Sequence, residues 1–149
     1  MSWPAVAGSL LLAVASPLAA AQPVDQHGTN QPWQGSDDQY TIIDFAASWC
    51  TPCWETLPKL EAFAKHNPRF KVIVVSVDDQ ERGRQELISG LDLALPVLWD
   101  ADYQIAEYFA PEALPASFVL APGGEIVYRH VGSNSDDWRE LIDYLAELD

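Results

Sequence analysis

The two cysteines of this chain stand three positions apart and are its most reactive side chains. Cys50 and Cys53 enclose Thr51 and Pro52, and the 149 residues contain no other cysteine. Two thiols at this spacing can exchange disulfides: the thiolate of Cys50 attacks a substrate disulfide, and Cys53 then attacks the resulting mixed disulfide and releases the product. The spacing therefore predicts a redox-active dithiol, with Cys50 as nucleophile and Cys53 as resolving thiol.

The residues on either side of the dithiol predict the elements that position it. Residues 40–46 are apolar and β-branched, which indicates a buried strand. Residues 51–65 carry apolar side chains at three- and four-residue spacing, which predicts an amphipathic helix. Cys50 would then lie at the helix N-terminus, where free backbone N–H groups and the helix dipole favour the thiolate.

The remaining sequence predicts a single α/β domain. Residues 70–77 resemble a second buried strand, so that strand, helix and strand form a β-α-β unit. A helix over 135–145 is indicated by Ser135 or Asp136 as its cap and by apolar residues at helical spacing. The other predicted elements are a helix over 80–89, an extended segment over 95–99, a helix over 102–109, and a hairpin of strands 117–120 and 126–129.

The first 39 residues of the sequence have a different composition. Residues 1–21 are uncharged, with an apolar run at 10–15 and small residues at 19–21, and we interpret them as a signal peptide cleaved before Gln22 or as an uncleaved membrane anchor. Residues 22–39 lack periodicity and are expected to be a loosely ordered linker arm. The domain would span 40–149 and face a periplasmic or other extracytoplasmic space.

Composition excludes some classes of function. The formal net charge is −14, with eight Lys and Arg against 22 Asp and Glu, so nucleic-acid binding is not expected. A zinc site is not expected either, because one cysteine pair needs two further ligands and the three histidines show no paired spacing. We expect neither a metal nor a cofactor.

An inert disulfide staple is the structural alternative for the cysteine pair. Closing so short a loop removes little chain entropy, on the order of 2 kcal/mol, compared with about 4–5 kcal/mol for a long loop. A domain of this size can also build a sufficient core without a staple. The spacing therefore favours the redox interpretation.

The run Asp-Phe-Ala-Ala-Ser-Trp-Cys-Thr-Pro-Cys at 44–53 resembles the active-site segment of the thioredoxin-like superfamily. The resemblance implies that Asp44 is a buried acid that assists deprotonation of the resolving cysteine. It also implies that Pro58 kinks the active-site helix and that Pro115 is a cis-proline beside the dithiol. Trp49, Thr51, Pro52 and Leu114 would form the surface on which a substrate docks.

This resemblance implies a thioredoxin-like fold, with a central mixed β-sheet flanked by helices. Residues 79–99 resemble the αβ insert of TlpA/ResA-type proteins, which are exported or membrane-tethered disulfide reductases that often serve cytochrome c maturation. Expected partners are therefore protein disulfides, with apocytochrome c as one candidate, and a membrane electron donor such as a transmembrane thiol reductase; the protein is expected to be a monomer. Two positions depart from that type, because Thr56 replaces a frequent Glu and Asp44 a frequent Asn.

Two other classes of function remain as alternatives. A peroxiredoxin-like peroxidase normally has a distant resolving cysteine, unlike this pair. A redox-inactive binding or copper-delivery module would need soft ligands, and the chain has one Met and two Cys. Among the alternatives, the resemblance and Asp44 favour an exported reductase.

Overall fold

The dithiol loop follows the central strand of a five-stranded mixed sheet. The computed structural model describes residues 22–148 and, before them, residues 2–5, 8 and 13. The strand order is β3-β2-β1-β4-β5. β1, β2 and β3 run parallel, whereas β4 is antiparallel to both β1 and β5. The strands are β1 (Tyr40–Ala46), β2 (Phe70–Ser76), β3 (Val97–Trp99), β4 (Ala116–Leu120) and β5 (Ile126–Val131).

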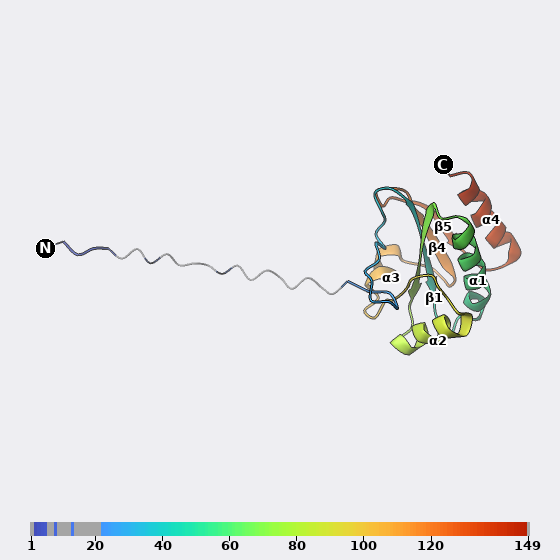
Figure 1. The fold of residues 1–149 in the computed structure, drawn as a ribbon, viewed down its shortest axis with the longest axis horizontal. Helices are drawn as coiled ribbons and strands as arrows, with labels where there is room; N and C mark the ends of the chain where they lie inside the picture. The colour runs from blue at the N-terminus through green and yellow to red at the C-terminus, as the bar shows by residue number, and fades with distance from the viewer. Residues whose placement is uncertain (1, 6–7, 9–12, 14–21, 149) are drawn as a thin grey trace.

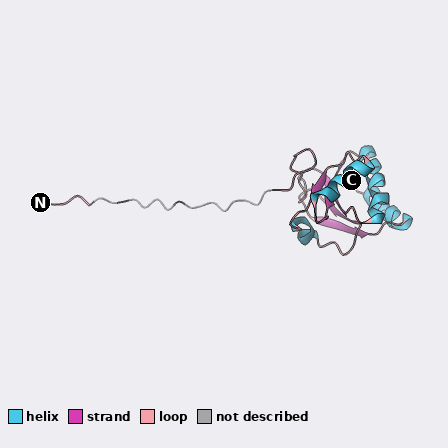
Figure 2. Cartoon of the chain, turned by 90° about the horizontal axis from the view of Figure 1, so that it is seen from below, coloured by secondary structure: helices cyan, strands magenta, loops and turns pink. Residues whose placement is uncertain are grey.

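Helices cover both faces of this sheet (Figure 1). Seen from below, the strands run between helices (Figure 2). In the part of the chain that the structure describes, no helix has the length and apolar content required to cross a bilayer. The helices are α1 (Thr51–His66), α2 (Glu81–Leu91), α3 (Gln104–Phe109) and α4 (Ser135–Ala146). The predicted mixed sheet flanked by helices is confirmed.

Alternating residues of β1 divide the core into two layers. Ile42 and Ala46 pack in the cluster that includes the buried residues of α1, α2 and α4. Ile43 and Phe45 point to the opposite face and pack with α3. Because strand side chains alternate between faces, Asp44 lies on the same face as Ile42 and Ala46, beneath α1.

The region predicted as an αβ insert contains α2 and β3. The helix predicted over 102–109 is shorter in the structure, where α3 begins at Gln104 and not at residue 102. Tyr103 has a left-handed backbone with φ 58°, and this ends any helix that would start earlier. The carboxylate of Asp100 accepts the N–H groups of Ile105 and Ala106 at 3.0 and 2.8 Å and so satisfies the first turn.

Residues 22–39 pack against the domain and do not form the loosely ordered arm that composition suggested. Asp25 is buried, and its carboxylate accepts hydrogen bonds from the N–H groups of His27 and Thr29 and from the side chain of Gln31. Burial opposes the charge, but these bonds lower the pKa of Asp25 below its ordinary value. These polar turn residues thus form a specific hydrogen-bonded turn around Asp25. The predicted signal or anchor segment over 1–21 lies outside the described residues, apart from positions 2–5, 8 and 13.

Trp33 anchors this segment in the core of the α3 face. Its side chain is 3% exposed and packs edge-on against Tyr108 and Phe109, with ring centroids 5.5 and 6.3 Å apart. Gln26 bonds across to β3, donating to the carbonyl of Leu95 and accepting from the N–H of Val97. The segment is therefore an integral part of the folded domain.

Replacing Trp33 with alanine is expected to lower the free energy of unfolding by about 3–5 kcal/mol, because it leaves a large cavity in a packed core. Urea unfolding of the oxidised protein measures this loss. Trp49→Ala is the matched control, because Trp49 is 68% exposed and its removal leaves no cavity. Equal effects of the two substitutions would show that residues 22–39 do not contribute to the core.

Candidate active site

Four chain segments meet at one edge of the sheet. The parallel strands β1, β2 and β3 end there, and the antiparallel β4 begins there. Cys50 follows β1, Asp78 follows β2, Tyr103 follows β3, and Pro115 precedes β4. In open α/β sheets this is the edge at which ligands bind.

The cysteines form a disulfide at the start of α1. Cys50 is the N-cap residue of the helix, in an extended conformation, and its Cα lies 5.3 Å from that of Cys53. No side chain caps the helix, and its first turn contains no acidic residue. Cys53 is fully buried and Cys50 is 4% exposed. Cys50, the predicted nucleophile, is thus the cysteine nearer solvent and lies next to free backbone N–H groups, which favour a thiolate.

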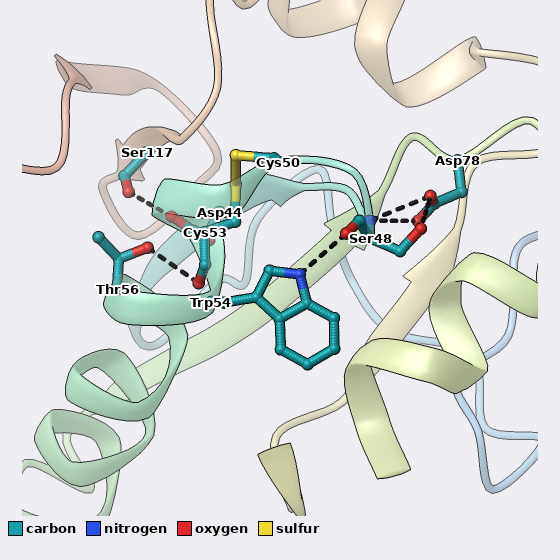
Figure 3. Close-up of a disulfide and its surroundings, with 8 residues drawn as sticks. All are labelled: Asp44, Ser48, Cys50, Cys53, Trp54, Thr56, Asp78 and Ser117. Carbon is teal, nitrogen blue, oxygen red and sulfur yellow. Dashed lines mark hydrogen bonds between the residues drawn. A yellow bond between two sulfur atoms is a disulfide. The ribbon is translucent and has the colours of Figure 1, made fainter. Parts of the chain in front are cut away.

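Asp44 is a buried acid with a single hydrogen-bond donor. Its Oδ1 accepts from the Ser117 hydroxyl at 2.7 Å, across the β1–β4 pair (Figure 3). Its Oδ2 has no partner among the residues that the structure describes. Burial raises the pKa of Asp44 to about 7, against the smaller opposing effect of the Ser117 hydrogen bond. Asp44 can therefore gain or lose a proton near neutral pH.

Asp78 holds the loop before Cys50 in place, a role that the sequence analysis did not predict. Its carboxylate accepts from the N–H and hydroxyl of Ser48 (Figure 3). It also accepts from the hydroxyl of Ser76. A side chain at position 83 would collide with it, so glycine is required there. The sequence signal that could have identified Asp78 is an acidic residue at the carboxyl end of a buried strand.

Trp54 braces the same loop from within α1. Its indole N–H donates to the Ser48 carbonyl at 2.9 Å, and its ring lies against Gly90 of α2, where a Cβ would come within 2.6 Å of it. Thr56, at the position where the TlpA/ResA type often has Glu, is buried and donates to the Cys53 carbonyl at 3.3 Å. Glu55 is exposed. Thr56 is thus hydrogen-bonded to the dithiol turn.

A groove of about 920 Å³ opens beside the disulfide. Its walls include all four residues predicted to form a docking surface, together with Cys50; these are Trp49, Thr51, Pro52 and Leu114. Pro115 is buried next to Leu114, and the peptide bond between them is cis, as the resemblance implied. Asp44 and Cys53 are buried and are not among the residues that line the groove. Asp79 and Tyr103, joined by a hydrogen bond from the Tyr103 hydroxyl, also line the groove and were not anticipated.

Comparison with known proteins identifies the family. A family model described as thioredoxin-like matches residues 37–126. The chain belongs to the thioredoxin-like family. The matched range contains strands β1 to β4, both cysteines, Asp44 and Pro115.

Relatives of this thioredoxin-like chain include proteins named for thiol–disulfide exchange. It is 29% identical over 99 residues to sporulation thiol-disulfide oxidoreductase A of Bacillus subtilis, covering 63% of this chain and 60% of that protein. Identity to thiol-disulfide oxidoreductase ResA of Bacillus cereus is 25% over 109 residues, covering 72% and 62%. The chain thus spans less than two thirds of the length of these relatives. The crystal structure of StoA from Bacillus subtilis has the same fold, with a TM-score of 0.70 at 23% identity over 84% of this chain and 95% of that one.

The raised pKa of Asp44 makes stability depend on pH. Between about pH 4 and pH 7 the folded protein retains the Asp44 proton, whereas an unfolded chain with the ordinary value of 3.8 has lost it. Folding is therefore favoured at low pH, and the contribution of Asp44 to the free energy of unfolding is lost as the pH rises through 7. Between pH 5 and pH 8 we expect the wild type to lose about 3 kcal/mol more stability than Asp44→Asn.

Urea unfolding of the oxidised proteins at the two pH values measures this difference. Oxidation keeps the thiols from titrating. Asp143→Asn, which removes an exposed carboxylate on α4, is expected to follow the wild-type pH profile. Parallel profiles for wild type and Asp44→Asn would mean that Asp44 has an ordinary pKa.

Proposed function

We propose that this protein is an exported thiol–disulfide oxidoreductase that reduces disulfides in other proteins. The observation that carries the proposal is a Cys50–Cys53 pair at the N-terminus of α1, beside an open groove and above a buried acid whose pKa is near 7. Each of these features has a distinct task in disulfide exchange.

The reaction begins with the reduced dithiol. The Cys50 thiolate attacks one sulfur of the substrate disulfide, so a mixed disulfide forms and the other substrate sulfur leaves as a thiolate, which takes up a proton. Cys53 then loses its proton and attacks the Cys50 sulfur, which releases the second substrate thiolate. The substrate gains two electrons and two protons, and the protein is left with the Cys50–Cys53 disulfide.

Asp44 supplies the base for the second step. Cys53 is fully buried, so water is not well placed to remove its proton. Asp44 lies on the face of β1 that is covered by α1, and its Oδ2 is available to accept a proton. A pKa of about 7 suits a group that takes up a proton during resolution and returns it afterwards.

The groove supplies the docking surface for the substrate. Trp49, Thr51 and Pro52 form one wall next to Cys50, and Leu114 forms part of the other. The backbone before Pro115 is positioned to pair with an extended substrate strand, because β4 begins at the residue after it.

The proposal also includes export of the protein and re-reduction of its dithiol. The apolar segment over 1–21 and the short run of small residues at its end support transfer to a periplasmic or other extracytoplasmic space. A reductase there must regain electrons from the membrane, for which a transmembrane thiol reductase is the candidate donor. Apocytochrome c is one candidate substrate.

The alternative functions have less support. The two cysteines are one helical turn apart, unlike the distant pair typical of the peroxiredoxin alternative. Copper delivery would be supported by further ligands near the dithiol, but no group of three or more potential metal-ligating side chains occurs within the described residues.

A redox titration tests the proposed direction of exchange. In glutathione or dithiothreitol buffers, followed by tryptophan fluorescence, we expect a reversible two-electron transition with a midpoint near or below about −220 mV. Trp49 and Trp54 flank the dithiol and should report its state. A midpoint above about −150 mV would assign the protein to the oxidants. Cys50→Ser is the control and should show no transition.

Trapping tests the assignment of the two cysteines. Without the resolving thiol, Cys53→Ser is expected to accumulate a mixed disulfide with a substrate protein, whereas Cys50→Ser should accumulate none. Non-reducing electrophoresis and mass spectrometry of the adduct identify the bonded cysteine. Adducts formed equally by both variants would contradict the assignment.

A further inference from the structure

We propose that the groove beside the dithiol selects disulfides whose cysteine is flanked by a basic side chain, Arg above all. This inference rests on the proposed function, because it names the substrates that the dithiol would reduce. It follows from the charges and aromatic rings that line the groove.

Two carboxylates line the groove from different directions. Asp79 lies beyond the end of β2, and Glu112 lies in the segment that leads into β4. These two strands flank β1 in the sheet, so the carboxylates approach Cys50 from both sides. A substrate segment that docks in the groove would therefore meet both carboxylates.

Nothing in the groove neutralises these charges. No Lys or Arg is among the groove-lining residues within the described part of the chain. Arg82 lies in the neighbouring depression that also includes Asp79, but its guanidinium is paired with Glu86 at 3.1 Å. Tyr103 donates its hydroxyl proton to Asp79, and this bond raises the pKa of Tyr103, so the tyrosine stays neutral and orients the carboxylate without cancelling its charge.

Aromatic rings complete a site suited to Arg. Trp49 is 68% exposed and Tyr103 is 41% exposed, and both line the groove. A guanidinium can stack on such rings while it bonds to a carboxylate, whereas an acidic side chain would be repelled. The net charge of −14 adds long-range attraction for basic segments.

The test compares three synthetic peptides that share one sequence and one internal disulfide but carry Arg, Gln or Glu on both sides of the reactive cysteine. Stopped-flow fluorescence gives the second-order rate constant for their reduction by the reduced full-length protein. We expect the order Arg, Gln, Glu, with on the order of tenfold between Arg and Glu at low ionic strength. The ratio should shrink in about 0.5 M salt, because the attraction is electrostatic.

Removing the two groove carboxylates tests whether they cause the preference for the Arg peptide. Asp79→Asn combined with Glu112→Gln is expected to reduce the Arg-to-Glu ratio to about twofold or less, because only the general charge of the protein then remains. The control pair Asp143→Asn and Glu147→Gln removes the same charge from the last turn of α4 and from its C-cap residue. This end of α4 is bonded to Arg69, beside the start of β2, and so lies at the sheet edge opposite the dithiol. The control should keep the wild-type ratio.

The outcomes separate the two proposals. Equal rates for all three peptides in the wild type, or the same loss of ratio in both variant pairs, would overturn the groove assignment and leave the reductase proposal standing. A dithiol that reduces none of the peptides, although it titrates reversibly, would overturn the reductase proposal and the groove assignment together. Tyr103→Phe, which keeps the Asp79 charge, should retain most of the preference if charge is the cause.

Discussion

The site depends on how β1 is paired within the sheet. β1 is parallel to β2 on one side and antiparallel to β4 on the other, with Ala46 opposite Ser76 and Phe45 opposite Ala116. This arrangement brings the exit of β1, the exit of β2 and the entry to β4 to one edge. The dithiol, the Asp78 brace and the cis-proline segment are therefore neighbours because of strand direction. A shift of one residue in the β1–β4 pairing would separate Asp44 from Ser117 and turn one of them to the opposite face.

The same pairing places the acidic side chain of Asp44 in the apolar core, where it contributes least to stability. Asp44 occupies a core position between Ile42 and Ala46 and receives one hydrogen bond, so its charged form is poorly solvated. An apolar side chain there would be expected to pack without this penalty. The free-energy cost of burial falls on the ionised form of Asp44, which is the form that can accept the Cys53 proton. Stability and the proposed proton transfer therefore place opposite demands on one side chain.

Sequence patterns predicted the elements of this fold better than its loops. Continuous apolar runs located β1 and β2, and helical apolar periodicity located α1, because buried elements leave a regular signal in the sequence. The segment 22–39 was misjudged, because Asp25 and Trp33 are ordered by hydrogen bonds and packing that have no periodicity. Asp44 and Pro115 were singled out by the resemblance, which also supplied their roles. Ser48, Asp78 and Tyr103 were missed, because their relation to the dithiol arises only when three parallel strands end at the same edge.

Charges around the dithiol bear on its direction of exchange. The N-terminus of α1 favours the Cys50 thiolate, but the nearby carboxylates Asp79 and Glu112 oppose it. A dithiol becomes a strong oxidant when its reduced form is stabilised, which commonly means a stabilised thiolate. Negative charge in the groove acts against that stabilisation and so favours the disulfide, which makes the reduced protein a better electron donor. The carboxylates proposed to attract a basic substrate would thus also favour its reduction, so that the proposed docking and the proposed electron transfer would depend on the same two side chains.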